Sequence, residues 1–163
     1  MDETMVARLR VAAVALAGVV AVTHLLHPSY GGPALLVYAS AGYLGDPRPV
    51  AFLAGGFLMV FAASMIVADV YRRGAYVLAA AVAGTFLVGF GVWHTLLDHG
   101  AFWPGLEPRG HPDTGVVVVL LDHLVGDWLT LTSKGAEAAL LVVCVVLFRA
   151  EAPRGDGPNS GSP

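Results

Sequence analysis

The sequence predicts an all-α integral membrane protein, a four-helix bundle with four transmembrane spans in a single domain. Hydrophobic residues make up 56% of the 163 residues and charged residues only 13%, whereas soluble domains average about a quarter charged residues. The mean hydropathy is +0.71. The apolar residues gather in four long stretches, at about residues 11–27, 50–70, 75–97 and 116–148, and a helix needs about 20 apolar residues to cross a bilayer.

The first stretch, residues 11–27, follows a short polar head that contains Arg8 and Arg10, and it ends before Pro28. A basic start followed by an apolar run is also typical of a secretory signal peptide. Because three further apolar stretches follow, we interpret this one as an uncleaved first transmembrane helix.

The connection at residues 28–50 is rich in Gly, Pro and Tyr. Its apolar segment, residues 34–44, is too short to span a bilayer, and Tyr30, Tyr38 and Tyr43 favour a position at the membrane interface. The second span at residues 50–70 is almost wholly apolar. The Arg72-Arg73-Gly74 sequence that follows predicts a tight turn into the third span at residues 75–97.

The fourth stretch, residues 116–148, is longer than a bilayer requires, so we expect its first two turns to stand above the membrane on the outer side. One face of this expected helix carries a polar stripe within an arc of about 80°. The stripe consists of His123, Asp127, Thr130, Lys134 and Glu137. Charged groups are costly in lipid, so the stripe should face protein, water or a ligand. The last part, residues 151–163, is rich in Pro, Gly and Ser and is predicted to be a disordered cytoplasmic tail.

The basic residues predict the orientation of the chain in a cell membrane. Six arginines fall on one side of the four spans, whereas only Arg48 and Arg109 fall on the other. The positive-inside rule therefore places both termini in the cytoplasm. All six histidines then lie toward the outer side: His24, His27, His94, His99, His111 and His123.

Charge and cysteine content exclude several functions. The net charge is −3 and no basic stripe is present, which argues against a nucleic-acid partner. Cys144 is the only cysteine, so an internal disulfide and a cysteine-based zinc knuckle are both excluded.

Histidine and aspartate recur four residues apart near the outer side. His94 precedes Asp98, and His123 precedes Asp127, each pair at a spacing that places both side chains on one helix face. Imidazole and carboxylate together suit a divalent transition metal such as zinc. The hypothesis is a metal centre built from His94, Asp98, His123 and Asp127 and completed by His24 or His27. Such a centre would serve a metal-dependent hydrolase at the membrane surface or a metal-handling protein, and the sequence does not decide whether the chain is an enzyme.

Three other interpretations stay open. Haem b held between His24 and His94 would make the chain a membrane electron-transfer or quinone protein. Lys134 and Glu137, three residues apart within the membrane, would form an ion pair that handles protons or supports the metal from below. Alternatively, the chain is a non-catalytic subunit whose polar stripe packs against a second copy or another membrane protein.

Overall fold

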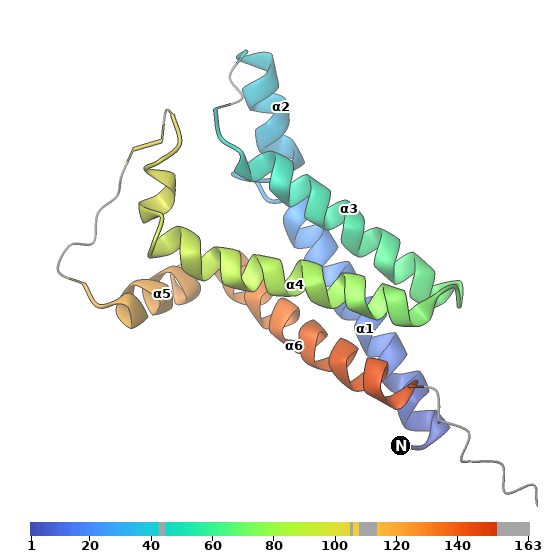
Figure 1. Ribbon diagram of the computed structural model, residues 1–163. Coiled ribbons are helices and arrows are strands. Elements are labelled where there is room, and N and C mark those ends of the chain that lie inside the picture. The colour runs from blue at the N-terminus through green and yellow to red at the C-terminus, as the bar shows by residue number, and fades with distance from the viewer. Residues whose placement is uncertain (43–44, 105, 108–113, 153–163) are drawn as a thin grey trace, which may run out of the picture.

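We describe a computed structural model of the protein for residues 1–42, 45–104, 106–107 and 114–152 (Figure 1). These residues form six α-helices and one short 3-10 helix, η1, and they contain no strand. The helices are α1 (Glu3–Leu25), α2 (Gly32–Ser40), α3 (Arg48–Val67), α4 (Arg72–His94), η1 (Asp98–Gly100), α5 (Val116–Val125) and α6 (Trp128–Ala150). The prediction of an all-α chain with four long apolar helices is confirmed for these residues.

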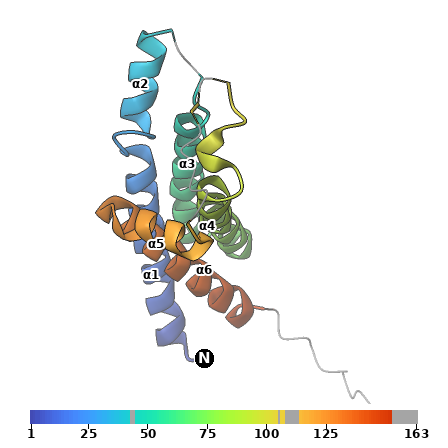
Figure 2. The ribbon, with the colours of Figure 1, turned by 90° about the vertical axis from the view of Figure 1, so that its left-hand side faces the viewer.

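The four long helices form a closed ring that the chain follows up and down. Helix α1 packs against α3 and α6, and α4 packs against the same two helices (Figures 1 and 2). The start of α1, the α3–α4 turn and the end of α6 therefore share one end of the bundle, the terminal end. The end of α1, the start of α3, the end of α4 and the start of α6 share the other, which we call the histidine end.

Small side chains allow the helices to approach closely. Helix α1 buries Ala13, Ala17 and Ala21 at four-residue intervals, and α4 buries Ala79 and Ala83 at the same spacing. Small residues repeated every fourth position bring helix backbones together, which is the usual packing in membrane helices. Larger buried side chains, including Met59, Tyr76, Leu140 and Leu147, complete the core.

The outside of the bundle is strongly apolar. Large side chains such as Phe57, Phe61, Val88 and Val142 are exposed on the long helices. In water, a continuous apolar surface of this kind would favour association, whereas in a bilayer it is the ordinary lipid-facing surface. Helices α1, α3, α4 and α6 are each long and apolar enough to cross a membrane. Both observations indicate a membrane-spanning protein.

The stretch at residues 116–148, expected to be one helix, is divided into α5 and α6. Helix α5 ends at Val125, with Gly126 as its C-cap. Asp127 has extended backbone angles and caps the N-terminus of α6. Gly126 keeps right-handed angles, but a Cβ at this position would lie 2.7 Å from the Asp122 carbonyl oxygen, so the close approach requires glycine. The aspartate cap then starts a new helix and overrides the continuous apolar pattern. The expected disordered tail falls mostly on residues 153–163, outside the described residues.

Glu151 ties three helices together at the terminal end. Its Oε1 accepts hydrogen bonds from Arg10 Nε and from the hydroxyl of Tyr76, both at 2.9 Å. Arg72 Nε lies 3.5 Å from Glu151 Oε2. Arg10 lies on α1 and Tyr76 lies on α4. The Glu151 carboxylate, which directly follows α6, therefore connects α1, α4 and α6 at the terminal end.

Candidate metal centre

His94 and His99 are brought together by a sharp reversal of the chain after α4. Helix α4 ends at His94. Asp98 and His99 then take positive φ angles of 41° and 58°, a left-handed conformation that aspartate tolerates better than most residues. The reversal folds η1 back against the end of α4 and buries His99, which is 6% exposed.

His123 reaches the same point from α5. Its Nδ1 lies 2.8 Å from the backbone carbonyl oxygen of Val119, and because a carbonyl only accepts, Nδ1 is the protonated nitrogen. In neutral His123, the lone pair is therefore on Nε2. This is how proteins usually orient a metal-binding histidine, with the remote ring nitrogen held by a carbonyl or carboxylate.

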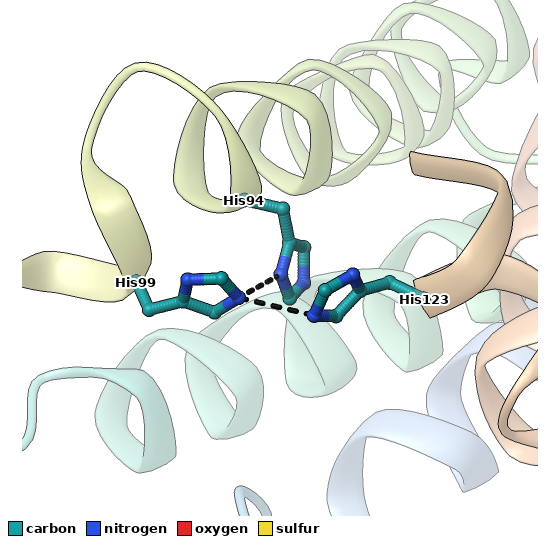
Figure 3. Close-up of side chains that lie close together, drawn as sticks. All are labelled: His94, His99 and His123. Atoms are coloured by element: carbon teal, nitrogen blue, oxygen red, sulfur yellow. Dashed lines mark hydrogen bonds between the residues drawn. The ribbon is translucent and has the colours of Figure 1, made fainter. Parts of the chain in front are cut away.

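The three imidazoles converge on one point at the histidine end of the bundle (Figure 3). His99 Nε2 lies 3.0 Å from His94 Nδ1 and 3.1 Å from His123 Nε2. One nitrogen from each of the three rings lies within 4.8 Å of the other two. Nitrogens bound tetrahedrally to zinc at about 2.0–2.1 Å lie about 3.3 Å from one another, so small ring movements suffice to place all three around one ion. We call His94, His99 and His123 the histidine triad.

The two expected histidine–aspartate pairs do not form a shared ligand set. Asp98 lies beyond the end of α4, so it is not one turn from His94 on the same helix; its Oδ1 lies 3.7 Å from His99 Nδ1 instead. Asp127 accepts hydrogen bonds from the backbone N–H groups of Leu129 and Thr130 and from the Thr130 hydroxyl. Burial alone would raise the pKa of Asp127, but these hydrogen bonds lower it below its usual value.

His27 also lies outside the triad. Its ring stacks on Tyr30, with ring centroids 4.8 Å apart. Burial lowers the pKa of His27, and the nearby Asp127 carboxylate opposes part of this decrease.

His24 occupies the interior of the bundle and is 1% exposed. Its ring packs between Phe52 and Phe86, with centroid distances of 4.8 and 4.1 Å. His24 Nδ1 lies 2.8 Å from the carbonyl oxygen of Val20, and Nε2 lies 3.4 Å from Glu137 Oε1. His24 is therefore engaged with α6 rather than with the histidine triad.

Lys134 and Glu137 form an ion pair next to His24. Lys134 Nζ lies 2.8 and 2.7 Å from the two Glu137 carboxylate oxygens, and the Ser133 hydroxyl donates to Oε1 at 2.8 Å. Lys134 Nζ also donates to the carbonyl oxygen of Phe86 at 3.3 Å. Glu137 is fully buried, so the lower part of the expected polar stripe faces the interior of the bundle.

His99 is the residue of this site that the spacing analysis missed. A helix-face argument finds His94 and His123, but His99 depends on a left-handed turn that no periodicity describes. The His99-Gly100 pair is the one local signal, because Gly100 also has a positive φ, of 88°. Comparisons with known protein families, with curated proteins and with solved structures find no match to this chain.

Proposed function

We propose that this chain is a multi-pass membrane protein that binds a divalent transition metal, with zinc as the first candidate, through His94, His99 and His123. The observation that carries the proposal is the convergence of three ring nitrogens from two separate segments of the chain, 24 residues apart at His99 and His123. Imidazole suits zinc, copper, iron and nickel. In this proposal the four long apolar helices span the membrane, and the site lies at one end of their bundle; the length and apolar composition of the helices support this.

Among the residues that the structure describes, the site has three protein ligands, a number that favours reactive metal chemistry over a purely structural role. Structural zinc sites usually have four protein ligands, whereas catalytic sites have three and keep one position for water or substrate. A metal held in this way supplies a Lewis acid and an activated water. We propose that the Asp98 carboxylate, whose Oδ1 lies 3.7 Å from His99 Nδ1, orients the His99 ring when a metal is bound, because metal-binding histidines commonly have a carboxylate at the remote nitrogen. We propose that metal-dependent hydrolysis or metal handling takes place at this end, facing the outside of the cell, with both termini in the cytoplasm.

The contacts give less support to the two alternatives. A haem between His24 and His94 would need both rings to present a nitrogen to the same iron, yet His24 Nε2 is directed toward Glu137 and His94 Nδ1 toward His99. The Glu137 carboxylate already accepts hydrogen bonds from Ser133 and Lys134 within the chain. Its burial therefore needs no partner protein on the polar stripe.

The test is metal binding by the purified protein in mild detergent, without a histidine tag. Elemental analysis should find near-stoichiometric metal after reconstitution with Zn²⁺ and removal of the excess. The His99→Ala variant should bind Zn²⁺ more than about 100-fold more weakly, since loss of an outer orienting group alone costs about 10–100-fold. The matched control is His27→Ala, which removes a nearby half-buried histidine outside the triad and should leave the affinity unchanged.

Two results would overturn the proposal. One is metal content at background after reconstitution. The other is equal loss of affinity in His27→Ala and His99→Ala, which would mean that scattered surface histidines bind the ion. An absorption spectrum of the same sample addresses the haem alternative, because a haem-loaded protein is strongly coloured and a zinc protein is not.

A further inference from the structure

A partly open cavity of about 310 Å³ lies between the long helices beside the histidine triad. All four long helices contribute to it, through residues such as His24, Phe52, Phe86 and Lys134, and His94 is part of its wall. Ligand cavities in proteins begin at about 300 Å³, and spaces between the helices of a bundle are one of their common locations. The cavity is large enough for one small ring system.

The walls of the cavity are rich in aromatic side chains, which are Tyr30, Phe52, Phe86, Phe90 and Trp93. Phe52 and Phe86 meet edge to face with centroids 5.5 Å apart, and Phe90 lies against His94 at 4.6 Å. The Arg48 guanidinium carbon lies 4.3 Å from the ring centroid of Tyr30 and 5.0 Å from that of Trp93. Aromatic walls of this kind favour a flat, apolar ligand, because rings stack and pack edge to face on one another.

Two buried nitrogens in the cavity wall make no hydrogen bond with the described residues. They are Trp93 Nε1 and His24 Nε2. An indole N–H only donates, and a buried donor without an acceptor is unfavourable. A ligand that carries a carbonyl oxygen would satisfy Trp93. His24 Nε2 lies 3.4 Å from Glu137 Oε1, so Trp93 is the polar group of the two that a ligand would satisfy.

The charges in the wall favour a neutral ligand over an anion. Arg48 Nη2 lies 2.6 Å from Asp46 Oδ2, and Asp46 is itself buried. Lys134 is paired with Glu137 in the same way. Each cation thus has its own carboxylate, so the wall has no net positive charge from these groups to offset the cost of burying an anionic headgroup.

We propose that this cavity binds the ring of a neutral, carbonyl-bearing, membrane-soluble molecule of the quinone class. Such a ring is flat and apolar, carries only hydrogen-bond acceptors in its oxidised form, and reaches the cavity from the lipid. Trp93 is the hydrogen-bond donor, and the aromatic wall holds the ring. The proposal goes beyond the metal site and does not require a bound metal.

The test is isothermal titration of decylubiquinone into the purified, chelator-treated protein in detergent, with empty micelles as the reference. Saturable one-to-one binding is expected. Gly89→Leu should weaken it strongly, because Gly89 lines the cavity at an exposed position of α4 and has no atom within 4 Å of an added Cβ, so the new side chain obstructs the open side of the cavity. Gly135→Leu is the matched control, since Gly135 is exposed on α6 and equally open at Cβ; it should bind like the parent protein.

A second pair of variants tests the hydrogen bond without filling the cavity. Trp93→Phe should weaken binding by about 2- to 10-fold, the usual value of one hydrogen bond. Trp128→Phe, which changes an exposed tryptophan, should have no effect. Decylubiquinone should also bind to the His99→Ala variant, which lacks the complete triad, so failure of the metal proposal leaves this result unchanged.

Three outcomes would overturn the quinone proposal. Quinone binding that survives Gly89→Leu together with Trp93→Phe would place the ligand elsewhere. Dodecanoate that binds more tightly than the quinone and competes with it would make the cavity an anion site. Dodecanol that binds as tightly as the quinone would mean that the cavity selects an alkyl chain and not a ring.

Discussion

Lys134 Nζ lies 2.7 Å from Glu137 Oε2 in the interior of the bundle, where Glu137 has no exposed surface. Removing one member of a buried ion pair leaves an uncompensated charge and typically costs about 3–5 kcal/mol. Glu137→Leu should therefore strongly destabilise the protein. The double variant Lys134→Leu/Glu137→Leu should recover most of that loss, because a buried pair replaced by apolar residues is often close to neutral.

Unfolding of the four proteins of this double-mutant cycle in detergent gives the coupling energy. Additive effects of the two single changes would show that the pair is not coupled.

Asp127 should act as a helix cap whose contribution depends on pH. Asp127→Ala removes the acceptor for the Leu129 and Thr130 backbone N–H groups and should cost about 0.5–2 kcal/mol, whereas Asp127→Asn should keep most of the capping. The pKa of Asp127 is lowered in the folded protein, so its stabilisation is complete above the usual aspartate pKa, about 4, and is lost as the pH falls further. Thermal unfolding between pH 3 and 7 checks this. Equal acid sensitivity of the parent protein and Asp127→Asn would contradict it.

His27 should make the protein less stable in mild acid. Burial lowers its folded-state pKa, so the unfolded chain binds the proton more readily, and stability falls as the pH drops through the usual histidine value of about 6.5. His27→Gln should flatten the decline in melting temperature between about pH 7 and 5. The experiment uses chelator-treated protein so that release of a metal does not contribute. An unchanged slope in the variant would assign the decline to other groups.

Glu151 should hold the terminal end of the bundle closed. Glu151→Gln removes the negative charge shared by Arg10 and Arg72, and we expect a loss of about 1–2 kcal/mol that shrinks at high salt because the arginines are partly exposed. Glu3→Gln, at an exposed position in the first turn of α1, is the control of equal charge change. Hydrogen exchange at the start of α1 and the end of α6 should increase in the Glu151 variant only. Equal increases in both variants would indicate a general charge effect.

The class of fold follows from apolar length alone, which is why the four long helices were predictable. The residues at which the helices begin and end were less predictable, because they depend on the residues that cap each helix. The Gly126-Asp127 pair divides a stretch whose Val and Leu content is continuous on both sides. Apolar residues indicate that a segment is buried in lipid or in the protein core. They do not indicate whether the backbone hydrogen bonds continue through the segment as one helix.

The candidate site was predictable only where it lies on regular helix. His94 and His123 are found by helix-face spacing, and the structure brings both into one cluster. Asp98 and Asp127 share that spacing in the sequence but lie beyond the helix ends, where spacing no longer determines direction. His99 enters the cluster through a turn with positive φ, and the contact of His24 with Glu137 depends on how α1 and α6 pack. The position of His99 and the contact between His24 and Glu137 both depend on tertiary structure, which the local sequence pattern does not specify.

His94 belongs to the histidine triad and to the wall of the cavity at the same time. Two ligands that share a side chain do not bind independently, and thermodynamics requires their influence to be mutual: if a molecule in the cavity changes the metal's dissociation constant by some factor, the metal changes that molecule's dissociation constant by the same factor. If both proposals hold, one imidazole at the end of α4 links the two binding equilibria, and the size of that linkage can be measured from either side.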